Sequence, residues 1–339
     1  MQLSKVDLKP RVSVVMPFRS AEATLRECIE SIRSQTMPSW ELIAVDDGSV
    51  DGGRSILENL NDPRIKVFPN PEKGIVAALN YGISKSSSGL IARMDADDIA
   101  FPKRLEKQLD FLSNNPVIGL CASKVEHFCK DDELNSTGMS EYVDWINDIC
   151  TPEEISENRF VESVLPHPSV VFRKELVDKF GGYREGGFPE DYEMWLRWLD
   201  AGVKMAKAPD ILLKWRDSGD RLSRTDPRYS RDAFFRLKAR YLAAFLEKRK
   251  VEKVWIWGAG RISRKKAAHL EEFGVSIEGY IDLNEKNNLP VHCISYKDIP
   301  ERGKIYILSY VSVRGARELI VNFLKEKGYE PVTDFMMVS

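Results

Sequence analysis

The chain has 339 residues, of which 43% are hydrophobic and 30% are charged, with 50 Lys and Arg against 52 Asp and Glu. This length predicts two domains, or one large domain with an appendage. The formal charge of −2 provides no broad basic field, so we do not expect nucleic-acid binding. No apolar run predicts a membrane span, and the N-terminus does not resemble a signal peptide. We therefore expect a cytoplasmic protein.

The first seventy residues alternate between strand-like and helix-like patterns. Strands are predicted at 12–16, 41–45 and 65–68, and a second helix is predicted near 54–61. In the first helix, four residues recur at the spacing of one helical face: Leu25, Cys28, Ile29 and Ile32. This alternation predicts an α/β fold with a mostly parallel central sheet and helices on both faces.

Two predicted strands end in carboxylates. One runs into Asp46 and Asp47, and a later strand at 90–94 runs into an acidic cluster of Asp95, Asp97 and Asp98. Because ligands of parallel sheets bind beyond the carboxyl ends of the strands, we expect both groups to line one crevice. Clustered carboxylates repel each other unless a cation is present, and oxygen ligands suit Mg²⁺ or Mn²⁺. A solvated acidic turn is the alternative interpretation.

The C-terminal part has a second β-α-β pattern. It follows a long helical pattern at 227–250, so we predict one domain at 1–248 and a small Rossmann-like domain at 249–339. A strand-to-helix turn there carries Gly258 and Gly260, and Asp282 ends the next strand. This arrangement is typical of a nucleotide-binding turn with an acid for the ribose. A purely structural turn without a ligand is an equal alternative.

Several motifs taken together resemble a known family. In chain order they read VSVVMPF, EATLRECIESIRSQ, VDDGSVDGG, NPEKGIVAALNYGI and IARMDADD, followed by HPSVVFRKEL, GGYRE and PEDYEMWLRW. This order resembles the family 2 glycosyltransferases, over about residues 10–240. The resemblance implies a GT-A fold and transfer of a sugar from a nucleoside diphosphate sugar with inversion. We expect the donor to be linked to UDP. The implied acceptor is a saccharide or a lipid-linked molecule of surface polysaccharide or glycoconjugate synthesis, reached by peripheral membrane association.

The resemblance also implies roles for individual acids. Asp47 matches the carboxylate that contacts the base of the nucleotide. Asp95 and Asp97 match the D-x-D pair, with Asp97 as the direct metal ligand. Asp191 matches the general base that deprotonates the acceptor hydroxyl, and Glu190 is expected to support it. The alternative for both is ordinary stabilisation of a helix N-terminus.

Other positions depart from the family or match it only loosely. After Pro17 the family usually has a small apolar residue, Tyr and Asn, whereas this chain has Phe18, Arg19 and Ser20. Arg19 could stack on the base or contact a phosphate. His167 is interpreted as a hydrogen-bonded structural residue on the acceptor side. Three cations could approach the donor phosphates, although the interpretation favoured for each is a surface charge: Lys73, Arg93 and Arg173.

Two rival functions stay open from the sequence. A nucleotidyltransferase also uses acidic strand ends and a metal, but it normally needs a phosphate loop near the first strand, and the segment PFRSAEA has none. A nucleotide-sensing module with an inactive first domain is the other rival, and the intact acids argue against it.

Overall fold

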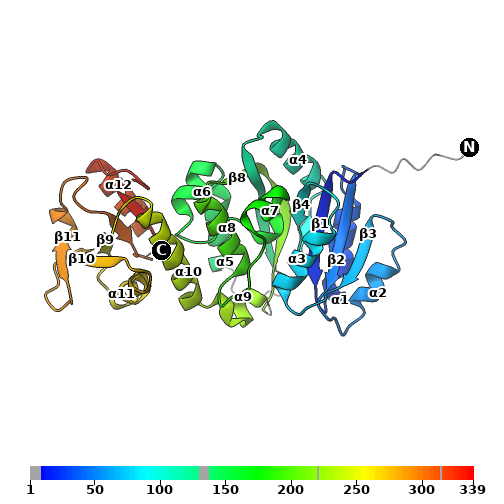
Figure 1. The fold of residues 1–339 in the computed structure, drawn as a ribbon, viewed down its shortest axis with the longest axis horizontal. Coiled ribbons are helices and arrows are strands. Elements are labelled where there is room, and N and C mark those ends of the chain that lie inside the picture. The colour runs from blue at the N-terminus through cyan, green and yellow to red at the C-terminus, as the bar shows by residue number, and fades with distance from the viewer. Residues whose placement is uncertain (1–8, 130–136, 220, 314) are drawn as a thin grey trace, which may run out of the picture. The chain divides into compact units, whose positions relative to one another are not determined.

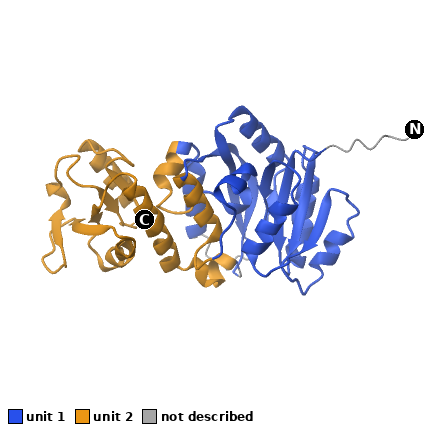
Figure 2. Ribbon diagram, in the orientation of Figure 1, with its two compact units in different colours: residues 1–152, 165–185, 201–221 blue, residues 153–164, 186–200, 222–339 orange. Residues whose placement is uncertain are grey.

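The computed structural model describes residues 9–129, 137–219, 221–313 and 315–339. The chain divides into two compact units, each built from separate stretches of sequence (Figure 2). The first unit comprises residues 1–152, 165–185 and 201–221, and the second comprises residues 153–164, 186–200 and 222–339. None of the helices in the described ranges is long and apolar enough to cross a membrane.

The first unit is built on an eight-stranded sheet with the order β3-β2-β1-β4-β7-β6-β8-β5. Figure 1 labels β1 to β4 and β8 of this sheet. The strands are β1 Val12–Phe18, β2 Trp40–Asp46, β3 Ile65–Pro69, β4 Leu90–Arg93, β5 Ile99–Ala100, β6 Ile118–Cys129, β7 Val171–Arg173 and β8 Lys204–Asp217. The first four strands are parallel, as predicted. However, β7 runs antiparallel to both β4 and β6, and β5 runs antiparallel to β8. The sheet is therefore mixed rather than mostly parallel throughout.

Helices cover both faces of the sheet in the first unit. They are α1 Glu22–Arg33, α2 Gly53–Glu58, α3 Ile75–Lys85, α4 Arg104–Asn114, α5 Thr137–Asp148 and α7 Glu175–Phe180, with a 3₁₀ turn η1 at His167–Ser169. The predicted apolar face of α1 is buried in a core that includes Val14 and Leu42. On the opposite face of the sheet, Ile43 and Val45 pack against Ala78 of α3. Alternate strand residues thus face different helices, which confirms the predicted α/β layering.

The second unit contains a separate parallel sheet with the order β11-β10-β9-β12-β13. Its strands are β9 Lys253–Trp257, β10 Ser276–Asp282, β11 His292–Ser295, β12 Ile307–Ser309 and β13 Phe335–Met337. Its helices are α6 Pro152–Asn158, α8 Glu190–Asp200, α9 Leu222–Thr225, α10 Arg231–Glu247, α11 Arg261–Ala267 and α12 Ala316–Glu326, with 3₁₀ turns η2 Pro227–Tyr229, η3 Ala268–Phe273 and η4 Tyr296–Asp298. The helix α10 shares a core with this sheet. The division at residue 248 stays a prediction, because the unit also includes chain before that point.

Candidate active site

The carboxyl ends of β2 and β4 lie at the same edge of the first sheet. Both strands pair in parallel with β1, which lies between them. Backbone hydrogen bonds continue past the strand ends, from Asp47 N to Phe18 O at 2.9 Å and from Met94 N to Val15 O at 3.1 Å. The two acidic segments therefore share one edge, as the sequence predicts.

The loop after β4 brings three carboxylates together. One oxygen from each of Asp95, Asp97 and Asp98 lies within 4.8 Å of the others. Burial and the neighbouring carboxylates of Asp97 and Asp95 raise the pKa of Asp98. Burial and the Asp95 carboxylate raise the pKa of Asp97 to about 6. Asp98 Oδ2 is also buried and lacks a hydrogen-bond partner among the residues that the structure describes. A set of close, incompletely neutralised oxygen ligands fits a hard divalent cation such as Mg²⁺ or Mn²⁺.

Buried arginines surround this loop. Arg93 is only 3% exposed and pairs through Nη1 with Asp95 Oδ2, so its interpretation as a surface charge is wrong. Arg104 Nη2 donates to the carbonyl of Arg93 at 2.7 Å, and burial lowers the pKa of Arg104 to about 10. Sequence reasoning missed Arg104. Its signal was periodicity, because Arg104 lies on the buried face of α4 with Gln108 and Leu112.

Arg173 lies at the end of β7 and is not a simple surface charge. Its Nε donates to the carbonyl of Ile118 at 3.1 Å, and its Nη2 donates to the carbonyl of Leu112 at 3.0 Å. The side chain therefore joins β7 to α4 and to the first residue of β6.

Asp47 follows β2 and holds the start of α3. Its Oδ1 accepts hydrogen bonds from Asn70 Nδ2 at 2.7 Å and from Gly74 N at 2.9 Å. Gly74 has a φ of 98°, a left-handed conformation that suits glycine. One carboxylate oxygen of Asp47 is thus committed to the fold.

The remaining predicted nucleotide-side residues differ in exposure. Arg19 and Lys73 are exposed. Pro17 is buried within β1, and the Phe18 ring is 4% exposed in the core. A contact from position 18 with a nucleotide would therefore come from its backbone rather than its ring.

His167 has the environment of a structural residue. It is 8% exposed, and its Nε2 lies 2.7 Å from the Tyr183 hydroxyl. Burial, together with the nearby positive charge of Arg93, lowers the pKa of His167. The imidazole is therefore neutral near pH 7. Sequence reasoning did not identify Tyr183 as its partner, although Tyr183 lies in the GGYRE motif.

Glu190 and Asp191 begin α8 in the second unit. Glu190 is 1% exposed, and its two oxygens accept hydrogen bonds from the Tyr229 hydroxyl at 2.9 and 2.7 Å. Asp191 is half-buried, and its Oδ1 accepts from the backbone N of Tyr192 at 2.7 Å. Sequence reasoning missed Tyr229. The two neighbouring acids therefore have different surroundings.

Side chains from neighbouring segments contact the turn after β9. Gly258 has a φ of 113°, and a Cβ there would lie 2.9 Å from Ser263 Oγ, so the position requires glycine. Asp282 Oδ2 accepts from Ala259 N at 3.0 Å and pairs with Lys286. Gly260 immediately precedes α11 and has an ordinary extended conformation. The acid expected for a ribose is thus engaged within the fold.

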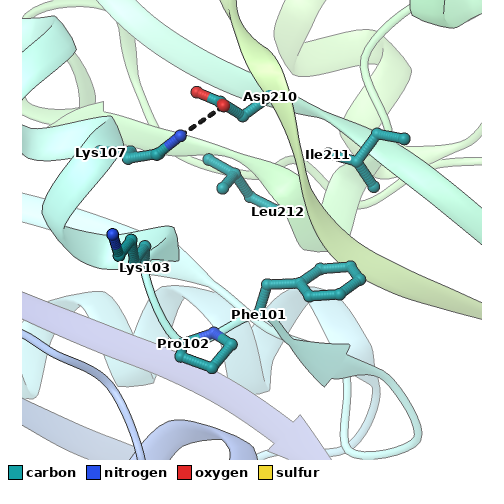
Figure 3. Close-up of a pocket in the computed structure, with 7 residues that line it drawn as sticks. All are labelled: Phe101, Pro102, Lys103, Lys107, Asp210, Ile211 and Leu212. Carbon is teal, nitrogen blue, oxygen red and sulfur yellow. Dashed lines mark hydrogen bonds and ion pairs between the residues drawn. The ribbon is translucent and has the colours of Figure 1, made fainter.

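A shallow pocket lies elsewhere in the first unit (Figure 3). It is lined by Phe101, Pro102, Lys103, Lys107, Asp210, Ile211 and Leu212, of which Lys107 and Asp210 form an ion pair. None of the predicted site residues lines this pocket, so it is separate from the acidic loop.

Residues 13–181 match the sequence model described as Glycosyl transferase family 2. A similar curated protein is the Escherichia coli "UDP-Gal:alpha-D-GlcNAc-diphosphoundecaprenol beta-1,3-galactosyltransferase", which is 32% identical over 64% of this chain and 78% of its own length. The fold resembles S. aureus TarS 1-349, solved with UDP-GlcNAc, at a TM-score of 0.55 and 17% identity over 78% of this chain and 71% of that one. It also resembles the mannosyltransferase PcManGT from Pyrobaculum calidifontis, solved with GDP-Man and Mn²⁺, at a TM-score of 0.50 and 18% identity over 78% and 70%.

These solved structures show the same kind of α/β fold with a mixed sheet, as in GT-A enzymes. The galactosyltransferase is more similar in sequence than these solved structures are, at 32% identity against 17% and 18%. The match also covers 78% of the length of that enzyme. The chain therefore belongs to glycosyl transferase family 2 and is a glycosyltransferase.

Proposed function

We propose that this glycosyltransferase transfers a sugar from a UDP-linked donor to a hydroxyl group, with inversion at the anomeric carbon. The observation that carries the proposal is the set of three carboxylates after β4, within 4.8 Å of one another. The TarS complex with UDP-GlcNAc and the galactosyltransferase named for UDP-Gal support the choice of donor. The family assignment makes a nucleotidyltransferase or a pure nucleotide sensor the weaker alternative.

In this proposal Asp97 and Asp95 hold Mg²⁺ or Mn²⁺, with Asp98 as the adjacent acid. The Mn²⁺ in the PcManGT complex supports a divalent ion. Such an ion would neutralise the negative charge of the donor diphosphate as it leaves. Arg93 already compensates Asp95, so the charge that most needs a cation lies on Asp97 and Asp98.

The chain's own residues supply the other roles in the proposal. Asp47, with one oxygen fixed by Asn70 and Gly74, would present its other oxygen to the base of the nucleotide. Arg19 and Lys73 would approach the base or the phosphates. Asp191 would take the proton of the acceptor hydroxyl, while Glu190 holds the start of α8 through Tyr229. A single displacement then needs no nucleophile from the enzyme.

The acceptor in this proposal is a saccharide or a lipid-linked saccharide, in polysaccharide or glycoconjugate synthesis. The galactosyltransferase relative supports this class, since its name specifies a diphosphoundecaprenol acceptor. The enzyme would act in the cytoplasm and would reach a lipid-linked acceptor by peripheral association with the membrane. His167 would stabilise the acceptor side through its hydrogen bond with the Tyr183 hydroxyl.

For the C-terminal turn we propose a structural role within a Rossmann-like domain. Gly258 is needed because Ser263 fills the space beside it, and Asp282 is bound to Ala259 and Lys286. A ligand would have to displace these contacts.

The test of the metal assignment is UDP binding measured by calorimetry with Mn²⁺ and with EDTA. Wild-type protein should bind UDP much more weakly in EDTA, because a diphosphate brought near uncompensated carboxylates is repelled. Asp97→Ala should likewise weaken UDP binding in Mn²⁺. Asp110→Ala, which changes an exposed acid on α4, should bind as wild type does. Equal UDP affinity of the wild-type protein in Mn²⁺ and EDTA would show that the metal assignment is wrong.

A further inference from the structure

Arg216 connects the acidic loop to distant parts of the first unit. It lies near the end of β8, 119 residues after Asp97, and is 4% exposed. Phe128 of β6 is its partner across the parallel strands, and the Arg216 guanidinium lies 4.5 Å from the centroid of the Phe128 ring. The Arg216 side chain is therefore buried and packed against the Phe128 ring.

Three hydrogen bonds extend from this residue to other segments. The backbone N of Arg216 donates to Asp98 Oδ1 at 2.8 Å. Its Nε donates to the backbone carbonyl of Asp97 at 2.6 Å. Its Nη2 donates to Glu27 Oε2 of α1 at 2.7 Å. Arg216 thus contacts the side chain of Asp98 and the main chain of the preceding acid, Asp97.

These contacts restrain the acidic loop after β4, in which like charges lie close together. The carboxylates of Asp95, Asp97 and Asp98 repel one another at close range. Without a brace, the loop could relax by turning its carboxylates apart. The planar guanidinium opposes this because its Nε and Nη2 donate at the same time to the Asp97 carbonyl and the Glu27 carboxylate, a forked pair of contacts that lysine cannot reproduce.

We propose that Arg216 is a positioning residue that holds Asp97 and Asp98 in the geometry that binds the divalent cation. This inference rests on the proposed function, since it assumes that the acidic loop binds a metal. Mg²⁺ and Mn²⁺ favour defined ligand geometries, so a loop that must be reordered binds them more weakly. Arg216 itself does not contact the ion in this scheme.

The test is direct binding of Mn²⁺ to the full-length protein, measured from the electron paramagnetic resonance signal of the free ion. Arg216→Lys keeps the positive charge and the backbone hydrogen bond to Asp98, but it loses the guanidinium contacts with the Asp97 carbonyl and with Glu27. We expect Mn²⁺ affinity to fall about 10- to 100-fold. Arg228→Lys is the matched control, because Arg228 makes a similar forked contact with Asp226 in the second unit. It should bind Mn²⁺ as wild type does.

A second variant keeps the test decisive if Arg216→Lys does not fold. Glu27 is 47% exposed, so Glu27→Gln should leave the fold intact while it weakens the contact to Nη2. We expect a smaller loss of Mn²⁺ affinity, of about 2- to 5-fold, since an amide oxygen still accepts the hydrogen bond but without the charge.

Activity gives a second readout that a merely structural role would not change. In Arg216→Lys the Mn²⁺ concentration for half-maximal activity should rise about 10-fold or more, whereas kcat at saturating Mn²⁺ should recover most of its wild-type value. A lower kcat at every Mn²⁺ concentration, with unchanged half-saturation, would overturn the inference.

The failure of this inference can be distinguished from failure of the proposed function. If Asp97→Ala loses Mn²⁺ binding but a folded Arg216→Lys binds Mn²⁺ like Arg228→Lys, only the role of Arg216 is refuted. If Asp97→Ala binds Mn²⁺ with wild-type affinity, the metal assignment itself fails, and the role of Arg216 fails with it.

Discussion

Glu190 and Asp191 are adjacent acids whose surroundings suit different tasks. Glu190 is buried, and both of its carboxylate oxygens accept a hydrogen bond from the Tyr229 hydroxyl. Burial and the Glu190 charge raise the pKa of Tyr229, so this hydroxyl stays protonated and keeps donating. Glu190 is therefore suited to fixing the helix start. Asp191 is half-buried in the first turn of the same helix.

From this difference we predict that Asp191→Asn loses turnover but not donor binding. Removing a general base typically lowers kcat by about 10² to 10⁴, because an amide cannot accept the proton of the acceptor hydroxyl. Steady-state kinetics should show this loss, and calorimetry should show near-normal UDP affinity, in contrast to Asp97→Ala. Asp232→Asn, a change of an exposed acid on α10, should have wild-type turnover. If Asp191→Asn keeps more than about a tenth of wild-type kcat, the base lies elsewhere, and Glu190→Gln is the next variant to measure.

Residues near one another in sequence were the most predictable part of the candidate site. Asp47 and the acidic loop follow strands with clear apolar patterns, so their common edge could be inferred from parallel pairing alone. The contacts of Arg216 with Asp97 and Asp98 could not, because they join residues more than a hundred positions apart. No local pattern encodes which distant backbone groups a buried arginine will meet.

At the scale of elements, periodicity predicted long segments and missed short ones. The strands β1 to β4 and the helices α1 and α2 agree with the expected β-α-β alternation. The antiparallel strand β7 has only three residues, Val171–Arg173, and its direction is set by pairing with β4 and β6. Three residues are too few to show an alternating pattern. The mixed character of the sheet therefore depends on tertiary contacts that the sequence pattern does not contain.

Glu41 of β2 joins several of these elements. Its carboxylate accepts hydrogen bonds from Ser13 Oγ of β1 at 2.6 Å, from Lys66 Nζ of β3 at 2.7 Å, and from the backbone N and Oγ of Ser87 at 2.7 Å each. Burial raises its pKa, but the hydrogen bonds from Lys66, Ser13 and Ser87 outweigh burial and lower the pKa to about 2. The charged form of Glu41 therefore stabilises the parallel half of the sheet.

We predict that the effect of Glu41→Gln on stability depends on pH. Because the folded-state pKa lies below the usual 4.5, the charged form contributes fully above about pH 5. This contribution shrinks as the pH falls from 4.5 towards 2. At pH 7, Glu41→Gln should lower the free energy of unfolding by about 2 to 3 kcal/mol, as urea denaturation can measure. The difference between variant and wild type should decrease at pH 3. Glu58→Gln, in an exposed pair with Arg54, should have little effect at either pH. An equal difference at pH 7 and pH 3 would contradict the role given to the charge.

For the molecule as a whole, the helix α10 decides where an independent C-terminal part can begin. Its buried residues Leu237, Leu242 and Leu246 belong to one core with Ile256 and Leu308 of the C-terminal sheet. In the same helix, Lys238 Nζ donates to the carbonyl of Val161 at 2.7 Å and lies 3.4 Å from that of Val338. The sheet therefore depends on chain that lies before residue 248. Periodicity identified α10 as a helix, but it could not show which sheet the helix covers.

Two C-terminal fragments differ in whether they contain α10. Residues 249–339 lack α10, whose five large apolar side chains are buried: Leu237, Tyr241, Leu242, Phe245 and Leu246. Burying such side chains contributes about 1.5 to 3 kcal/mol each, and their sum is comparable to the whole stability of a small domain, about 5 to 15 kcal/mol. Fragment 227–339 should therefore unfold cooperatively on heating, as followed by circular dichroism, whereas fragment 249–339 should be unfolded or melt at a much lower temperature.

Two substitutions in the longer fragment separate core packing from mere length. Leu242 is fully buried on α10, so Leu242→Ala should lower the free energy of unfolding of fragment 227–339 by about 2 to 5 kcal/mol. Arg240 is exposed on the same helix, so Arg240→Ala should change it by less than about 0.5 kcal/mol. If fragment 249–339 instead melts as high as fragment 227–339, the sheet is stable without α10. The domain boundary then lies at residue 248, as the sequence pattern predicts.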